Sequence, residues 1–288
     1  MSSLQLAPRA SFEVRYLPER SNRFLMCKGK LFAFVLLLTL AIPSGSRAQF
    51  GPRPAPPAPG KAGAPVDFTG DWVAFVTEDW RWRMVTPLKG DAASIPTNAA
   101  ARKVIDAWDP AKDEAAGLQC KAYGAPAIMR VPGRLHITWQ DDLTLKIETD
   151  AGQQTRLLHF AGEPPKGAER SWQGYSAAKW EGPAPTPNPP VFFGLGIAPR
   201  LGSTSRSLEV VTTQLRAGYL RKNGVPYSEN AVLKEYFDRF DEPNADSWLM
   251  VMTVVEDPAY LAIPFVTTSH FKKIPVGSGW DPQPCTAR

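Results

Sequence analysis

Short stretches of alternating hydrophobic and polar residues recur along the chain, which is the pattern of β-strands that bury one face. Between Arg134 and Gln140, every second residue is apolar: Leu135, Ile137 and Trp139. We therefore expect a strand here whose apolar face packs against a core. Alternation, or enrichment in β-branched and aromatic residues, predicts further strands at residues 71–77, 143–149, 153–160, 176–180, 207–213, 232–240, 248–256 and 263–272.

The spacing of these strands predicts an all-β fold. Asp141-Asp142 lies between two of them and predicts a tight hairpin. Helical spacing of apolar residues predicts one helix, over Asn98–Trp108. Short strands joined by hairpin turns predict an antiparallel β-barrel or a sandwich, with one or two short helices. A barrel has the advantage that no edge strand is left unpaired.

The N-terminus has the three parts of a secretory signal peptide. Lys28 and Lys30 precede an apolar run of twelve residues, 31–42, and a small-x-small triplet predicts cleavage after Ala48. The alternative is a membrane anchor, but the run is shorter than the roughly 20 residues that cross a bilayer. Met26 would start a more typical leader, so we expect translation from there. The mature protein is expected in the periplasm or the medium, with no membrane span.

These patterns divide the chain into five segments. Residues 1–48 form the leader. The proline-rich stretch 49–66 is expected to be a linker, because it has too little apolar surface to offset the entropy lost on ordering. The barrel domain spans 67–275 and contains an insertion at 182–206, which is either a lid or a plain insertion between two strands. Residues 276–288 form a C-terminal tail.

Removing the leader changes the charge of the protein. The chain has 33 Lys and Arg and 28 Asp and Glu; seven of these bases and two of these acids lie in residues 1–48. The rest of the chain therefore carries 26 of each, and its formal net charge is zero. This balance lacks the basic footprint of nucleic-acid binders, so no nucleic-acid partner is expected.

Two cysteines remain after the leader, Cys120 and Cys285. An even pair in an exported protein predicts a disulfide; two free buried thiols are the alternative. Neither cysteine has the spacing of a zinc motif. The three histidines, His136, His159 and His270, lie on separate expected strands without paired spacing, so no metal site is predicted. The chain has no phosphate-binding loop and no dinucleotide fingerprint, and no cofactor is expected.

Two sets of motifs carry a resemblance to known proteins. Gly70-Asp71-Trp72 places a G-x-W motif at the first expected strand, which is similar to the motif of lipocalins. The second set comprises Trp172-x-Gly174-x-Ser176, Trp180-Glu181-Gly182, Leu208–Thr213, Asn223-Gly224, Glu235-Tyr236-Phe237-x-Arg239 and Glu256-Asp257-Pro258-x-Tyr260. This set resembles a large group of uncharacterised exported bacterial proteins, over roughly residues 67–272. The resemblance implies export and a lipocalin-like barrel, and the insertion after Gly182 departs from it.

The stretch TEDWRWRM, which ends at Met84, concentrates aromatic and cationic residues. Strand alternation would place Trp80, Trp82 and Met84 on one face and Arg81 and Arg83 on the other. We expect the tryptophans to face the barrel interior, where they pack in a core or line an apolar cavity. In the alternative orientation, the arginines point inward and bind an anionic ligand bidentately.

The aromatic residues suggest a binding function. The candidate ligand-binding residues are Trp80, Arg81, Trp82, Arg83, Trp139, Trp172 and Trp180. We expect a small apolar or aromatic molecule to bind inside the barrel. One alternative is a calycin-type enzyme, an isomerase, hydratase or hydrolase, for which the sequence identifies no catalytic residue. A second alternative is an interaction protein of the cell envelope.

Four carboxylates near the shared motifs are candidates for acid/base chemistry: Glu181, Glu235, Glu256 and Asp257. A buried carboxylate pair with a raised pKa could transfer protons. The alternative is that these residues cap turns or pair with Arg239 and other bases, and we expect this second role.

The first testable prediction concerns export. A chain expressed from Met26 with its leader should be recovered from the periplasm or the medium, with Gln49 as its first residue. N-terminal sequencing checks this. An intact leader on a membrane-embedded protein would contradict it.

Overall fold

The structure is a computed structural model that describes residues 58–167, 169–181 and 207–288. The expected leader, the first half of the expected linker (residues 49–57) and the 182–206 insertion lie outside these residues.

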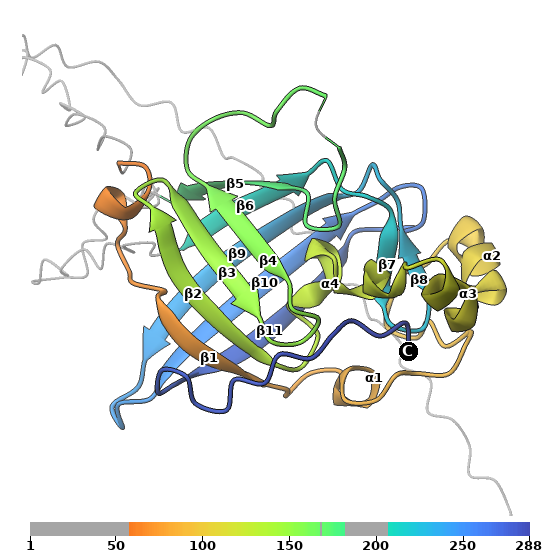
Figure 1. Ribbon diagram of the computed structural model, residues 1–288, viewed down its shortest axis with the longest axis horizontal. Coiled ribbons are helices and arrows are strands. Elements are labelled where there is room, and N and C mark those ends of the chain that lie inside the picture. Colours follow the sequence, from red (N-terminus) through yellow and green to blue (C-terminus); the bar gives the residue numbers. More distant parts are fainter. Residues whose placement is uncertain (1–57, 168, 182–206) are drawn as a thin grey trace, which may run out of the picture. The chain divides into compact units, whose positions relative to one another are not determined.

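Nine strands form a closed barrel (Figure 1). They are β1 (Gly70–Phe75), β2 (Arg134–Asp141), β3 (Thr144–Thr149), β4 (Thr155–His159), β5 (Tyr175–Trp180), β6 (Leu208–Thr213), β9 (Val232–Asp241), β10 (Ser247–Glu256) and β11 (Phe265–Ile274). The order around the barrel is β1-β11-β10-β9-β6-β5-β4-β3-β2, and β1 closes the sheet because it pairs with both β11 and β2. The predicted all-β barrel and its nine predicted strands are thus confirmed.

The barrel differs from that of lipocalins in two respects. Lipocalin barrels have eight up-and-down strands, whereas this sheet has nine. In addition, β4 and β5 pair in parallel, with Leu158 opposite Ser176. All other neighbours in the barrel are antiparallel, including the β2–β3 hairpin predicted at Asp141-Asp142.

Short helices and one hairpin gather at one end of the barrel (Figure 1). They are α1 (Trp80–Arg83), α2 (Ala99–Ala107), α3 (Pro110–Ala115), the 3-10 helix η2 (Gln119–Tyr123), α4 (Ala125–Ile128) and the hairpin of β7 (Gly218–Arg221) and β8 (Val225–Tyr227). The predicted helix is α2, which Asn98 caps by accepting the N–H groups of Ala100 and Ala101. Among the described helices, none has the length and apolarity needed to cross a bilayer.

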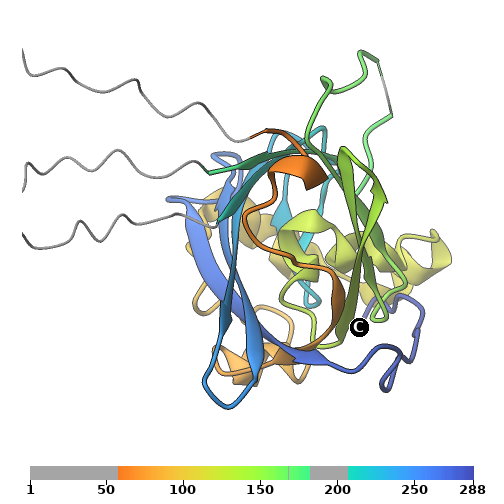
Figure 2. The same ribbon diagram turned by 90° about the vertical axis from the view of Figure 1, so that its left-hand side faces the viewer.

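The other end of the barrel lies next to the 3-10 helix η1 (Lys61–Gly63). Figure 2 looks into the barrel from this end, with η1 in front and α4 behind it. The carbonyl oxygen of Gly60 accepts a hydrogen bond from the Trp180 indole at 2.7 Å, and the Lys61 amide donates to the Asp142 carbonyl oxygen at 2.9 Å. The folded unit therefore begins before residue 66, because the last part of the expected linker packs on the barrel.

A hydrophobic core fills the barrel. Trp72, from the G-x-W motif, is fully buried, and its indole donates to the Phe68 carbonyl oxygen at 2.9 Å. Ile128 and Met129 belong to the same core cluster, so α4 and the residue after it close one barrel end. Other members of this cluster are Leu135, Ile137, Leu145, Ile147, Leu158, Phe237, Leu249, Val251 and Phe271.

One ion pair lies within this core. Arg156 on β4 and Glu235 on β9 have fully buried side chains and form two hydrogen bonds, at 3.0 and 2.6 Å. A third contact joins Arg156 to the Thr212 hydroxyl at 3.5 Å, and Thr212 is bonded to Ser176 at 2.7 Å. This bidentate geometry compensates both charges inside the barrel.

The prediction that TEDWRWRM forms a strand is wrong, because it forms the single helical turn α1. Phe75 ends β1, and Asp79, the residue before α1, has a left-handed backbone conformation (φ 50°) that departs from strand geometry. The amides of Trp82 and Arg83 then donate to the Asp79 carbonyl oxygen at 2.8 and 3.1 Å. A helical turn does not alternate side chains between two faces. As a result, Trp80 points to solvent with 66% of its surface exposed, whereas Arg83 is buried.

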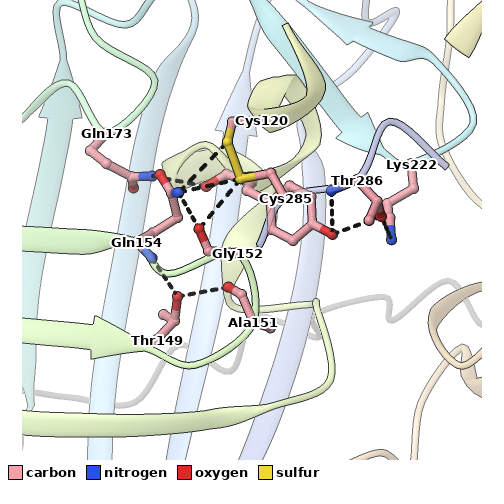
Figure 3. The surroundings of a disulfide bond; sticks show 10 residues. Cys120, Thr149, Ala151, Gly152, Gln154, Gln173, Lys222, Cys285 and Thr286 are labelled. Atoms are coloured by element: carbon pink, nitrogen blue, oxygen red, sulfur yellow. Dashed lines mark hydrogen bonds between the residues drawn. A yellow bond between two sulfur atoms is a disulfide. The ribbon is translucent and has the colours of Figure 1, made fainter. Parts of the chain in front are cut away.

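The predicted disulfide between Cys120 and Cys285 is confirmed, with an S–S distance of 2.03 Å (Figure 3). It joins η2 to the C-terminal tail. Gln154 donates to the carbonyl oxygen of Gly152 beside the bridge. In the same turn, the Thr149 hydroxyl donates to the Ala151 carbonyl oxygen.

The disulfide generates a prediction about stability. The Cys120→Ser/Cys285→Ser double variant should lose about 2–4 kcal/mol of unfolding free energy, because the bridge constrains a long loop in the unfolded chain. Chemical denaturation measures this loss. A thiol assay on the unreduced, denatured wild-type protein should find no free thiol; two thiols would contradict the bridge.

The buried ion pair generates a second prediction. Glu235→Gln should cost about 3–5 kcal/mol, because the Arg156 guanidinium is left buried without its counter-charge. The Arg156→Met/Glu235→Met double variant should recover most of this loss. Glu256→Gln is the matched control, since Glu256 pairs with Lys234 at the partly exposed surface, and it should cost about 0–1 kcal/mol. Equal losses in both single variants would contradict the assignment.

Candidate anion-binding site

Three arginines from distant parts of the chain are buried at the helix-covered end of the barrel. Arg83, Arg130 and Arg221 expose only 9%, 8% and 7% of their surfaces. Arginine is rarely buried to this degree unless it is paired. These three side chains therefore define the candidate site.

Arg83 comes from α1. Because the side chain of Arg83 is turned away from solvent, its Nε reaches the segment after α4 and donates to the Arg130 carbonyl oxygen at 2.9 Å. This bond uses one of the five N–H donors of the guanidinium. Nη1 and Nη2 of Arg83 are also buried, and neither has a hydrogen-bond partner among the described residues.

Arg130 follows α4. Its amide donates to the Ala127 carbonyl oxygen at 2.9 Å, which continues the turn of the helix. One Nη donates to Asp79 at 2.6 Å, and the guanidinium lies 5.7 Å from the centre of the Phe265 ring. The other Nη is buried and, within the described residues, unpartnered.

Arg221 ends β7. Its Nη groups donate to the carbonyl oxygens of Asp91 and Ala93, at 3.3 and 3.0 Å, and to the Ser94 hydroxyl at 3.0 Å. These acceptors hold the position of the guanidinium, but they are uncharged. It also lies 5.4 Å from the centre of the Trp82 ring.

Trp82 forms an aromatic wall of the site. Its indole donates to the Asp91 carboxylate at 3.1 Å, which fixes the ring plane. Asn223 donates to the Leu88 and Asp91 carbonyl oxygens at 2.9 and 2.8 Å, so the loop behind the ring is held as well. Trp82 is thus a rigid partner for Arg221.

The environment of the cluster disfavours the charged forms of Arg83 and Arg221. Burial, and then the charge of Arg130, lower the pKa of Arg83 to about 10. The same two causes, in the same order, lower the pKa of Arg221 to about 10. Both groups remain protonated at neutral pH, and of the three only Arg130 has an ion pair within the described residues, with Asp79.

A small cavity of about 50 Å³ lies between these groups. Its lining residues are Trp82, Arg83, Val85, Thr86, Ala122, Ala127, Arg130, Val131, Pro132, Leu220, Arg221 and Lys222. This volume suits a few water molecules or one small oxyanion. Unused guanidinium N–H groups are the donors that carboxylate, sulfate and phosphate oxygens accept.

Of the seven ligand-binding residues predicted from the sequence, the structure brings only Trp82 and Arg83 to this cavity. Trp80 and Arg81, their neighbours on α1, point to solvent, although the Arg81 guanidinium also covers the Trp82 ring at 5.4 Å. Trp172 lies beside α4, under Arg216 at 4.7 Å.

Trp139 and Trp180 lie at the opposite barrel end. Both rings pack against Phe160, at centroid distances of 5.5 and 5.1 Å. Trp180 also stacks on Phe68 at 5.9 Å. These tryptophans are members or neighbours of the core cluster, and they do not contribute to the arginine site.

The other candidate residues do not converge either. His136 bonds to Asp71, His159 stacks on Tyr175 at 4.8 Å, and His270 bonds to Thr77 at 3.2 Å. Among residues 58–167, 169–181 and 207–288, no three His, Cys, Asp or Glu side chains are grouped as a metal site requires.

Three of the four candidate carboxylates, Glu235, Glu256 and Asp257, have the second of the roles considered from the sequence. Glu256 pairs with Lys234 at 2.7 Å, and Asp257 accepts both the amide and the hydroxyl of Ser228, at 2.7 and 2.8 Å. Glu235 pairs with Arg156, as described above. Glu181 follows β5 directly, and its amide bonds to the Ser207 carbonyl oxygen at 3.0 Å.

Sequence reasoning missed Arg130 and Arg221. The signal for Arg130 was available, because this arginine directly follows the apolar stretch Ala125–Met129, where a solvated cation is not expected. Arg221 gave no comparable signal, since the chain around it reads as a polar turn.

Comparison of the chain with protein-family models, with curated proteins and with solved structures found no match. The motif resemblance to exported bacterial proteins therefore stays a prediction.

Proposed function

We propose that this protein is an exported binding protein for a small molecule that carries a carboxylate, sulfate, sulfonate or phosphate group. The observation that supports it most directly is the convergence of three buried guanidinium groups on one cavity. Two of them, those of Arg83 and Arg130, hold buried N–H donors without partners in the described part of the chain.

The energetic argument is that such a cluster destabilises the fold when no anion is bound. Burying a charge is costly unless it is paired and hydrogen-bonded. Among the described residues, one carboxylate forms an ion pair with a guanidinium of this cluster: Asp79, which pairs with Arg130. An anion in the cavity would supply both the missing charge and the missing acceptors, and its binding would be stabilising by mass action.

The site lies at the end of the barrel, not in its interior where the sequence led us to expect it. The interior holds a packed core and the compensated Arg156–Glu235 pair. Trp82, one of the aromatic residues that the sequence suggested for ligand binding, lines the cavity together with Val85 and Leu220. A lining of cations and apolar groups favours binding over the alternative of a calycin-type enzyme.

Export remains part of the proposal. The basic, apolar and small-residue parts of the leader support it. The Cys120–Cys285 disulfide is consistent with it, because disulfides persist mainly in oxidising compartments such as the periplasm or the medium.

The binding proposal predicts an anion-dependent gain in stability. Sodium sulfate should raise the melting temperature above that in sodium chloride of equal ionic strength, by about 2–4 °C for each kcal/mol of binding free energy. Sulfate also stabilises proteins without binding, so the comparison needs variants. Arg83→Gln should remove the sulfate-specific part, whereas Arg81→Gln, an equal charge loss on the exposed side of the same turn, should retain it.

A further variant separates binding from structure. Arg83→Met should have an unchanged or higher melting temperature without sulfate, since it removes a buried charge that has two unused donors. The depressed pKa of Arg83 implies the same sign: a cation with a lowered folded pKa destabilises the fold at every pH below that pKa, about 10. Equal sulfate responses in the wild-type protein and in both Arg83 variants would refute the site.

A further inference from the structure

The arginine cavity continues into a larger groove. The groove has a volume of about 390 Å³, within the range of small-molecule sites, whereas the cavity of about 50 Å³ holds only the anionic group of a ligand. The lining residues common to both are Arg83, Thr86, Val131, Pro132 and Lys222. The rest of a ligand anchored in the cavity would therefore extend into this groove.

The C-terminal tail forms one wall of the groove. Asp281, Gln283 and Pro284 are lining residues. The tail runs along the turn at 150–152, because the Gln283 amide donates to the Asp150 carbonyl oxygen and the Gly152 amide donates to the Gln283 carbonyl oxygen, both at 2.9 Å.

The disulfide holds this wall in place. Of residues 276–288, only Ala287 is buried, so the tail has little apolar surface to keep it on the barrel. Cys285 ties it to Cys120, and the next residue, Thr286, accepts a hydrogen bond from Lys222 at 2.9 Å (Figure 3). Without the covalent bond, a few hydrogen bonds would have to offset the entropy of ordering the tail.

The groove offers few free charges to a ligand. Arg134 and Asp150 pair with each other at 3.4 Å, and Lys222 is engaged with Thr286. The apolar side chains that line the groove are Met84, Tyr123, Val131, Pro132, Ala151 and Pro284. Such a lining suits an uncharged, partly apolar body.

We propose that the ligand is an organic anion with an uncharged body. Its anionic group binds in the arginine cavity, and its body lies in the groove against the disulfide-held tail. This inference rests on the proposed function and adds to it the class of ligand and a role for the Cys120–Cys285 bond in binding.

The test uses three probes that separate the two parts of the ligand. The anionic probe is 1-anilinonaphthalene-8-sulfonate, which joins a sulfonate to an aromatic body. N-phenyl-1-naphthylamine is the same body without the sulfonate, and inorganic sulfate represents the anionic group alone. Fluorescence titration of the full mature protein should give saturable binding of the sulfonate probe. Its affinity should exceed that of the neutral probe by about tenfold or more, and sulfate should compete with it.

Two variants then locate the body. Ala151→Trp adds an indole to the wall of the groove, at a residue that does not line the arginine cavity and leaves the disulfide bond itself intact. This substitution should lower the affinity for the sulfonate probe by about tenfold and leave the affinity for sulfate unchanged. Cys120→Ser/Cys285→Ser, or reduction of the wild-type protein, should have the same selective effect. Circular dichroism checks that each variant is folded. If the cysteine variant is unfolded, the affinity of Ala151→Trp for the sulfonate probe alone tests whether the body lies in the groove.

The outcomes distinguish this inference from the proposed function. Sulfate binding together with an unchanged affinity of Ala151→Trp for the sulfonate probe would overturn the groove as the site of the body. The same result for the folded cysteine variant would overturn the role of the tail. A different result would overturn the anion site and the proposed function with it. In that case sulfate does not bind the wild-type protein, and Arg83→Gln binds the sulfonate probe with the same affinity as the wild-type protein.

Discussion

Closure of the barrel is the constraint on which the rest of the structure depends. β1 pairs with β2 on one side and with β11 on the other, so its short stretch of sequence joins the two edges of the sheet. Closure removes the unpaired edges and encloses a space that the inward side chains fill, with Trp72 among the largest of them. Because this interior is packed, groups that meet a ligand have to lie at the barrel ends, where short helices and loops are free to depart from strand geometry.

The two ends use this freedom differently. Near η1, Trp180 is tied to the Gly60 carbonyl oxygen and stacks on Phe68, so aromatic packing and one hydrogen bond fasten the incoming chain to the barrel. At the other end, α4 inserts apolar residues into the barrel and carries Arg130 directly behind them. The same segment therefore closes the core and supplies a cation to the site, which couples the position of the arginine to the packing of the barrel.

The sequence predicted the barrel well and the site poorly, for one physical reason. In strands such as β2 and β3, buried and more exposed residues alternate because each strand has one face in the core. The sequence of such a strand therefore shows a hydrophobic period of two residues. α1 is a single turn, too short to carry a period of its own, and its neighbours in space decide its shape. Arg83 was identified for its charge in the alternative orientation considered from the sequence, but Arg130 and Arg221 join it only through the tertiary fold.

The protein buries arginines in two different environments, and the difference indicates that the arginine cluster is functional. Arg156 lies in the core with a bidentate carboxylate partner, so this fold is able to compensate the charge of a buried guanidinium, although the Nε of Arg156 has no hydrogen-bond partner among the described residues. Arg83 lies at the barrel end with two unused donors, beside the like charge of Arg130. Selection for stability alone would replace such a residue by an apolar one of similar size. An arginine with unused donors and no direct ion pair among the described residues, in a chain that elsewhere pairs a buried arginine, is therefore best explained by an anion that the protein binds.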